Sequence, residues 1–169
     1  MTIHSEHPFQ PPEDERSPVR RFRSRLVSPV TVWTAGDTAA RAGLTVSSML
    51  AADGEPGYLV GVIDALSDLA DALPRTGQVV VNQLDWPRRE LADAFGFTAP
   101  SPGGPFARAD WTQTAWGPAL VASSWAGGDV VATQELGWGL LVTLVVRQVE
   151  LAGDEPPLAH RRGRYLTVA

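Results

Sequence analysis

Short apolar segments separated by turn residues recur along the chain and predict β-strands. Four of them precede residue 85, namely 29–35, 44–52, 58–63 and 78–84. They are rich in Val, Leu and Thr, and short runs of this composition favour strands. Gly and Asp residues in 35–43 predict a hairpin loop between the first two strands.

The C-terminal part of the chain continues this pattern. Region 119–151 is again rich in strand-forming residues, with turns expected at Gly127–Gly128 and around Gly137. Residues 165–168 are expected to be extended.

Two segments change to a helical period. In 64–73, Leu and Ala residues fall at helical spacing, and the following "PRTG" predicts the end of that helix. Segment 86–96 has Pro near its start and Gly at its end, as helices often do. With six or seven mostly antiparallel strands and two inserted helices, the predicted fold class is mostly β, a closed or partly open barrel.

The N-terminal part differs in composition. Residues 1–24 are polar, Pro-rich and charged, which predicts a flexible tail before a single domain over 25–169. Residues 20–26, which span the end of this tail, form a short basic patch, interpreted as a solvated lead-in that could form a helix. The alternative is an anion contact by Arg21, Arg23 or Arg25.

Charge and composition exclude several classes of protein. A chain of 169 residues suits one domain, and its net charge of −5 argues against nucleic-acid binding. Without cysteine there are no disulfides, thiolate nucleophiles or Cys-based metal sites. No apolar run is long enough to cross a membrane, and no secretory signal is recognisable, so a cytoplasmic protein is predicted.

Little in the sequence supports acid–base, nucleophilic or metal chemistry by the protein itself. A G-x-G-x-x-G fingerprint, a P-loop and a G-x-S-x-G elbow are absent. His160 is the one histidine outside the predicted tail, so neither a metal site nor a catalytic triad is expected. No catalytic side chain is therefore assigned, and an enzyme built on this barrel would rely on a bound cofactor.

Three hydroxyls stand out in the second predicted strand. Thr45, Ser47 and Ser48 lie between two apolar runs. Either they form the solvent face of an ordinary strand, or they and the neighbouring main-chain groups contact a ligand.

The order of motifs resembles the flavin reductase family, whose fold is the FMN-binding split barrel. The matching stretches, in order, are "SPVTVWTA", "AGLTVSSM", "DGEPGYLVGV", "SDLADAL", "VVVNQL", "ELADAFG", "WGPAL" and "HRRGRY". The strand "GWGLLVTLVV" occupies the place of another family strand. Each motif alone is weak, but together they span nearly the whole chain from about residue 25.

The resemblance implies a homodimer with flavin bound near the subunit interface. It implies reduction of FMN, or alternatively FAD, by NADH or NADPH, with reduced flavin released in many members to a partner monooxygenase. Carried onto this sequence, Thr45, Val46, Ser47 and Ser48 would contact the flavin ring and ribityl chain. Asn82 would lie near the ring edge, although a buried amide could equally be bonded to protein.

Two stretches depart from the family pattern. The segment expected to hold the flavin phosphate offers Ser67, but its neighbours Asp64, Asp68 and Asp71 would repel an anion. The helix N-terminus there, or Arg88, Arg89 or Arg41, would have to compensate. A histidine expected before "WGPAL" is absent, and Trp111 and Trp116 stand there instead, either as core or as stacking residues.

The C-terminal "HRRGRY" supplies the last candidate contacts. His160, Arg162 and Tyr165 would face cofactor phosphates or the flavin, or else belong to a solvated basic terminus. The predicted function is thus an NAD(P)H-dependent flavin reductase. The alternatives are a flavin- or deazaflavin-binding protein without catalysis and a ligand-free interaction module.

Overall fold

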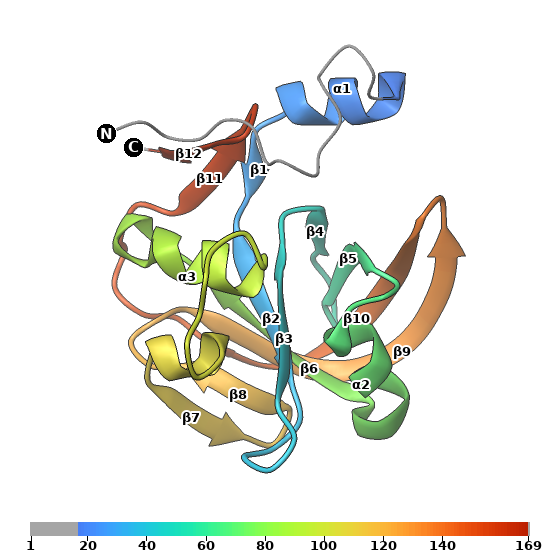
Figure 1. Ribbon diagram of the computed structural model, residues 1–169. Helices are drawn as coiled ribbons and strands as arrows, with labels where there is room; N and C mark the ends of the chain where they lie inside the picture. The colour runs from blue at the N-terminus through green and yellow to red at the C-terminus, as the bar shows by residue number, and fades with distance from the viewer. Residues whose placement is uncertain (1–16, 169) are drawn as a thin grey trace.

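The computed structural model describes residues 17–168, which form a curled antiparallel sheet with short helices at its ends (Figure 1). Its strands are β1 (Ser28–Pro29), β2 (Thr31–Ala35), β3 (Ala42–Val46), β4 (Met49–Ala52), β5 (Tyr58–Asp64), β6 (Gln78–Gln83), β7 (Trp111–Thr114), β8 (Gly117–Leu120), β9 (Trp125–Leu136), β10 (Gly139–Glu150), β11 (Leu158–Arg161) and β12 (Arg164–Thr167). Its helices are α1 (Pro18–Arg25), α2 (Asp68–Thr76) and α3 (Arg89–Phe95), with 3-10 turns η2 (Trp86–Arg88) and η3 (Pro105–Arg108). The mostly β fold class is therefore confirmed.

The largest sheet has seven strands and curls until its two edges almost meet. Its order is β3-β2-β6-β9-β10-β5-β4, so the edge strands β3 and β4 are consecutive in the chain. Only Ser47 and Ser48 connect them. We call this connection the seam. The expectation of one continuous strand over 44–52 was wrong, because the chain leaves β2 at the seam and pairs with β5 instead.

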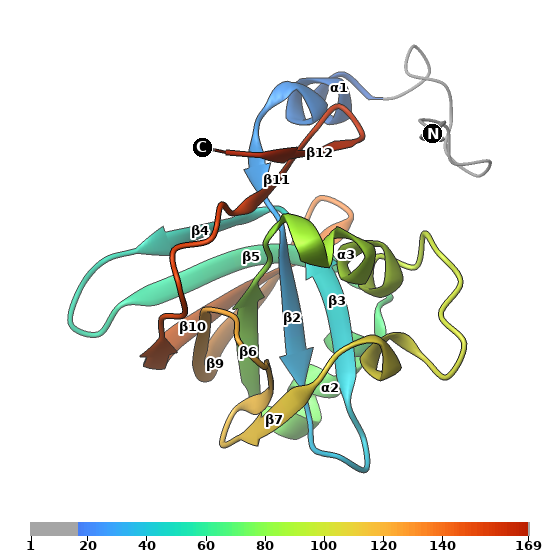
Figure 2. The same cartoon turned by 90° about the vertical axis from the view of Figure 1, so that its left-hand side faces the viewer.

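A smaller sheet lies at one end of the barrel. β1 pairs with β11 and β11 with β12, and α1 packs beside them. Figures 1 and 2 both place α1, β11 and β12 above the curled sheet, and α2 towards its lower end. Because β1 runs directly into β2, whose Thr31 pairs with Val46, the small sheet and the seam lie at the same end.

The two inserted helices follow the third and fourth predicted strands, as expected, but their bounds differ. Helix α2 begins later than predicted because the Ser67 side chain caps it, and it continues through Pro74 to the left-handed Gly77. Segment 86–96 divides into η2 and α3, and Asp85 caps the first of these turns.

One hydrophobic cluster fills the barrel, and a second lies on the opposite face of β2, beneath α3 and β8. The first surrounds Trp33 and includes Leu69 and Leu73 from α2. The second surrounds Phe95 from α3, whose ring makes edge contacts with Phe106 and Trp111 at centroid distances of 4.9 and 5.6 Å. The core interpretation of Trp111 therefore holds.

The turn expected at Gly127–Gly128 was wrong, since both residues lie inside β9. Neighbouring atoms approach both positions so closely that there is no room for a side chain. A Cβ atom on Gly127 would lie 2.7 Å from the Trp116 ring, which places that tryptophan against the sheet as well. The turn at Gly137 and the extended C-terminus are confirmed.

Part of the predicted tail is structured. Residues 1–16 lie outside the described residues, but 18–25 form helix α1, which Ser17 caps by accepting a hydrogen bond from Arg20 N. No helix in the described part of the chain is long and apolar enough to cross a membrane.

Candidate functional site

The seam exposes polar groups that the fold itself does not use. β3 is an edge strand bonded to β2 on one side only, so alternate main-chain groups face away from the sheet. Ser47 and Ser48 are half-buried, and their hydroxyls make no hydrogen bond with any other residue between 17 and 168. The Ser48 carbonyl accepts a hydrogen bond from Val62 N at 2.9 Å, which holds the seam in place. The two hydroxyls thus remain available to a ligand.

The neighbouring residues Thr45 and Val46 have structural roles. The Thr45 hydroxyl donates to the Ala92 carbonyl of α3 at 2.7 Å. Val46 is buried in the first core cluster, and its carbonyl accepts from the Thr31 hydroxyl at 2.7 Å. Both therefore position the seam, and their side chains are committed to the protein.

Helix α3 joins the seam to the C-terminal hairpin. The residue after Ala92 is Asp93, whose Oδ1 accepts a hydrogen bond from the Tyr165 hydroxyl at 2.6 Å. The His160 and Tyr165 rings meet edge to face, with centroids 5.8 Å apart. Three of the predicted site residues, Thr45, His160 and Tyr165, are thereby brought to one end of the barrel.

Burial shifts the titration of both ring residues. Burial lowers the pKa of His160, the nearby positive charge of Arg23 lowers it further, and Asp93 opposes this. Burial and the hydrogen bond to Asp93 together raise the pKa of Tyr165 well above its usual range. At neutral pH the pair is therefore a neutral imidazole beside a protonated phenol.

Arg162 lies in the turn between β11 and β12. Its side chain is exposed, its φ is +51°, and its backbone N donates to the Ser24 carbonyl of α1 at 2.8 Å. It therefore belongs to the same end of the barrel, on the surface shared with α1.

Asn82 has no group left for a ligand. Its side chain is fully buried, and its amide nitrogen donates to the Val32 carbonyl at 3.0 Å and to the Thr34 hydroxyl at 3.1 Å. Its oxygen accepts from Leu120 N at 2.7 Å. The interpretation with protein partners therefore holds, and a flavin-edge contact by this side chain does not.

Ser67 is committed to helix α2. Its hydroxyl donates to the Asp64 carbonyl at 2.7 Å and accepts from Ala70 N at 3.2 Å. The first turn of α2 also carries Asp68 and Asp71. This helix N-terminus is therefore already capped and negatively charged, which disfavours phosphate there.

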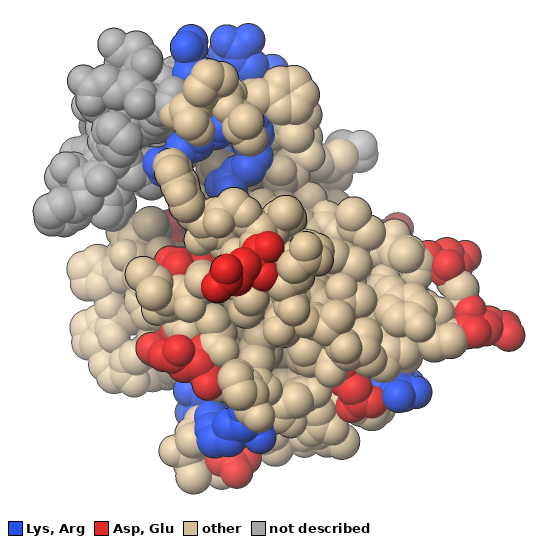
Figure 3. Space-filling view, turned by 90° about the vertical axis from the view of Figure 1, so that its right-hand side faces the viewer, with Lys and Arg blue, Asp and Glu red and all other residues tan. Residues whose placement is uncertain are grey.

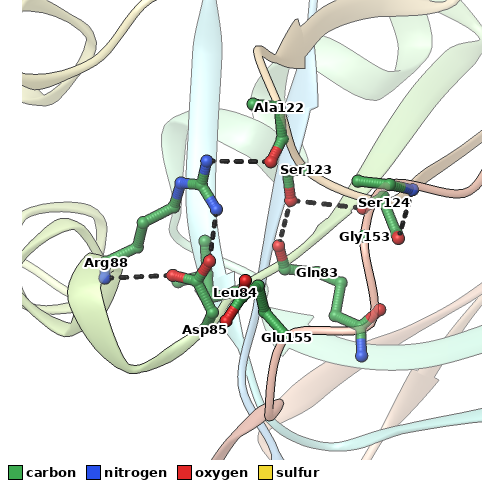
Figure 4. Close-up of a pocket in the computed structure, with 10 residues that line it drawn as sticks. Gln83, Leu84, Asp85, Arg88, Ala122, Ser123, Ser124, Gly153 and Glu155 are labelled. Carbon is green, nitrogen blue, oxygen red and sulfur yellow. Dashed lines mark hydrogen bonds and ion pairs between the residues drawn. The ribbon is translucent and has the colours of Figure 1, made fainter.

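Arg88 is also committed. Its guanidinium donates to Asp85 Oδ2 at 2.5 Å and to the Ala122 carbonyl at 2.9 Å, beside a shallow open depression (Figure 4). Figure 4 shows the polar groups there bonded to one another, including Ser123 to the Gln83 carbonyl. With Asp85 and Glu155 in its lining, this depression has few free groups to offer an anionic ligand.

The sequence interpretation missed two residues at the upper end of the barrel. Ala92 and Asp93 lie within "ELADAFG", where the apolar period marked only the buried face of the helix. A polar Asp on the other face gives no signal of its partner 72 residues away. No group of three or more His, Asp or Glu residues suited to a metal occurs in the part of the chain that the structure describes.

Comparison with known proteins identifies the family. The model of the flavin reductase like domain matches residues 23–169. The chain belongs to the flavin reductase family. The resemblance drawn from the ordered motifs is thereby confirmed.

Individual relatives support this membership at low sequence identity. The chain is 28% identical over 160 residues to a protein of Ancylobacter novellus named FMN reductase (NADH) RutF, covering 94% of this chain and 88% of that one. A RutF of Methylorubrum populi is 26% identical over 156 residues, covering 91% of this chain and 77% of that protein.

Solved structures show the same fold. NADH:FAD oxidoreductase SgcE6 of Streptomyces globisporus superposes with a TM-score of 0.81 at 18% identity, covering 95% of this chain and 96% of that one. BorF, the flavin reductase component of a bacterial two-component tryptophan halogenase, gives a TM-score of 0.78 at 17% identity, covering 89% and 96%.

Proposed function

We propose that this protein is an NAD(P)H-dependent flavin reductase that transfers a hydride from a nicotinamide to FMN, with FAD as the alternative flavin. The observation that carries the proposal is the seam of a flavin reductase family member, where two serine hydroxyls have no hydrogen-bond partner among residues 17–168 and the edge strand β3 leaves main-chain groups unpaired. The relatives' names, FMN reductase (NADH) and NADH:FAD oxidoreductase, support the choice of substrates.

Each residue at the upper end of the barrel has a role in this proposal. The Ser47 and Ser48 hydroxyls and the free main-chain groups of β3 would bind the flavin, while Thr45 keeps the strand against α3 through Ala92. His160 and Tyr165 would form a neutral wall beside it. A bound flavin supplies the hydride acceptor, so the protein contributes mainly by holding the two substrates together.

The chemical test follows nucleotide oxidation. Purified protein is mixed with NADH or NADPH and with FMN, FAD or riboflavin, and absorbance at 340 nm is recorded. We expect oxidation that requires the flavin. A yellow protein that leaves the nicotinamide intact would instead favour a flavin- or deazaflavin-binding protein. A colourless protein with no thermal shift on adding flavin would favour an interaction module.

Variants at the seam test the site separately from the activity. Ser47→Ala/Ser48→Ala is expected to raise the KM for flavin about thirtyfold, because two hydrogen bonds of about 1 kcal/mol each are lost. Thr38→Ala, in the exposed loop between β2 and β3, is the matched control and should leave the KM unchanged. An unchanged KM in the double variant would remove the seam from the proposal.

We also propose a homodimer that meets at the outer face of the sheet beside the seam. Strand alternation points Leu50, Val60, Val62, Leu141 and Thr143 outward, and none is charged. Figure 3 shows the side of the molecule towards β9 and β10, where uncharged residues cover most of the surface and acidic side chains stand among them. An uncovered apolar sheet face of this kind favours a protein interface.

The oligomeric state tests this face. Val60→Glu is expected to convert a dimer to a monomer in sedimentation experiments and to weaken flavin binding, because the seam adjoins this surface. Val149→Glu, at the other end of β10 and already 53% exposed, is the control that should stay dimeric. A wild-type monomer at assay concentration would contradict the proposal.

A partner monooxygenase that receives reduced flavin is a further part of the proposal. BorF is one component of a halogenase system, and another structural neighbour is nitrilotriacetate monooxygenase component B. Flavin that leaves the enzyme after reduction is consistent with the acidic, capped start of α2, where a phosphate would find no strong grip. A cytoplasmic location remains a prediction from the sequence.

A further inference from the structure

Half of the arginines of this acidic protein gather at the end of the barrel that carries the seam. They are Arg20, Arg21, Arg23 and Arg25 of α1, and Arg161, Arg162 and Arg164 of the β11–β12 hairpin. We call this group the arginine cap. No acidic residue occurs in 17–27 or 158–168, and all seven arginines are exposed.

The cap is concentrated locally and does not follow from a generally basic surface. The chain has 14 basic residues, all of them arginines, and 19 acidic residues. Outside the cap, seven arginines are therefore outnumbered by the acidic residues. Both ion pairs between residues 17 and 168 lie elsewhere, at Arg88–Asp85 and Arg147–Asp129. Figure 3 shows the basic side chains grouped at the top of the molecule, over α1, and scattered charges of both signs below.

The fold holds the two halves of the cap together against their mutual repulsion. Arg162 N donates to the Ser24 carbonyl at 2.8 Å, and Arg161 Nε donates to the Arg25 carbonyl at 3.1 Å. Like charges a few ångströms apart repel even in water, by about 1 kcal/mol for a pair at 4 Å. An anion between the two segments would relieve this cost.

The cap lies next to the proposed flavin site. Tyr165 follows Arg164 and is bonded to Asp93, the residue after the one that anchors Thr45. Arg23 is close enough to His160 for its charge to influence that ring. Figure 2 shows α1 and the β11–β12 hairpin above β4 and α3.

The other candidate phosphate contacts already interact with groups of the protein. Ser67 is used as a helix cap among aspartates, and Arg88 is bonded to Asp85 and two carbonyls. Arg41 and Arg89 lie over the Phe106 and Trp86 rings. Guanidinium groups bind phosphate through paired N–H donors and keep their charge at any working pH.

We propose that the arginine cap binds the phosphate groups of the nucleotide whose ring lies at the seam. This rests on the proposed function and adds the anchor for the charged end of the substrate. The phosphate belongs either to FMN or FAD, or to the nicotinamide dinucleotide, and the chemistry of the cap is the same for both.

The experiment compares substrates with and without phosphate. Arg21→Gln/Arg23→Gln is the test variant, and Arg75→Gln/Arg108→Gln removes the same charge from exposed positions outside the cap. If the cap binds flavin phosphate, the test variant loses about tenfold or more in kcat/KM for FMN and keeps its value for riboflavin. If it binds the nicotinamide phosphates, the loss appears with NADH and not with reduced nicotinamide riboside, which carries no phosphate.

Two further measurements separate the cap from general effects. Raising the salt concentration should raise the wild-type KM for the phosphorylated substrate and leave the non-phosphorylated one nearly unchanged. Arg21→Lys/Arg23→Lys should recover part of the loss, because charge is restored without the guanidinium fork. Thermal melting confirms that each variant is folded.

The outcomes that overturn the proposal are distinct from failure of the function. Flavin reduction with equal loss, or no loss, for phosphorylated and non-phosphorylated substrates would remove the cap and leave the reductase assignment intact. Unchanged kinetics with free flavin, but slower turnover coupled to a flavin-dependent oxygenase, would assign the cap to an acidic protein instead. No reduction of any flavin by the wild type would remove the proposed function itself.

Discussion

The indole ring of Trp33 on β2 lies against the backbone of Gly61 on β5, across the interior of the barrel. A Cβ atom at position 61 would lie 2.5 Å from Trp33 Cη2, well inside van der Waals contact. Trp33 is fully buried and its Nε1 donates to the Thr31 hydroxyl at 3.1 Å, so the ring has no room to retreat. The two sides of the curled sheet are thus fitted to each other at a position without a side chain.

Gly61→Ala is therefore expected to destabilise the protein by about 1–3 kcal/mol, the usual cost of overpacking a core. Urea denaturation followed by tryptophan fluorescence measures this. Gly153→Ala is the control, because a Cβ there meets no atom within 4 Å. A wild-type midpoint for Gly61→Ala would show that Trp33 moves freely and that the barrel interior is loosely packed.

Asn82 ties together β2, β6 and β8 in the core. Asn82→Leu should lower the free energy of unfolding by at least about 2 kcal/mol, because the buried Leu120 N–H loses its acceptor and the Val32 carbonyl loses a donor. Gln83→Ala, the exposed neighbour on the same strand, should change stability little. If Asn82→Leu is as stable as wild type but binds flavin weakly, Asn82 contacts the flavin, and its structural role is contradicted.

The local pattern of apolar residues was enough to predict the bounds of strands that are buried along most of their length. Strands β5 and β6 were predicted within a residue of their bounds because each is a short, almost continuous apolar run. The seam was not foreseen, since a strand that changes partners keeps the same alternation of side chains. The start of α2 was misplaced because Asp64 and Ser67 can both cap a helix, and the structure uses Ser67.

The candidate site was predicted only in part, because local sequence patterns reveal contiguous residues but not contacts between distant segments. The serine pair at the seam is contiguous in sequence and was recognisable. The hydrogen bonds of Asn82 to residues on β2 and β8, and of Tyr165 to Asp93, join segments 38 to 72 residues apart, and no local pattern marks them. Arg88 is different, because Asp85 stands three residues before it and the pairing could have been expected.

Tyr165→Phe tests the link between α3 and the C-terminal hairpin. Loss of the bond to Asp93 should cost about 1–2 kcal/mol at pH 7. Because the pKa of Tyr165 is raised in the folded state, its contribution is fully present below about pH 10 and is lost as the pH rises further. Urea midpoints at pH 7 and pH 10.5 should therefore show a larger gap between wild type and variant at pH 7. Tyr58→Phe, on the exposed start of β5, is the control.

His160 predicts a loss of stability towards acid. Its pKa is lowered in the folded state by burial and by Arg23, so the unfolded chain takes up a proton first as the pH falls. The stability that the neutral ring provides is fully present above the unfolded pKa of about 6.5 and decreases below it, until the folded ring is also protonated.

Free energies of unfolding measured at pH 8, 6.5 and 5 should fall more steeply for wild type than for His160→Asn. Arg23→Gln should reduce the slope without abolishing it, because burial remains, whereas Arg108→Gln should leave it unchanged. Parallel curves for wild type and His160→Asn would mean that the pKa of His160 is the same in the folded and the unfolded chain, and would contradict the prediction.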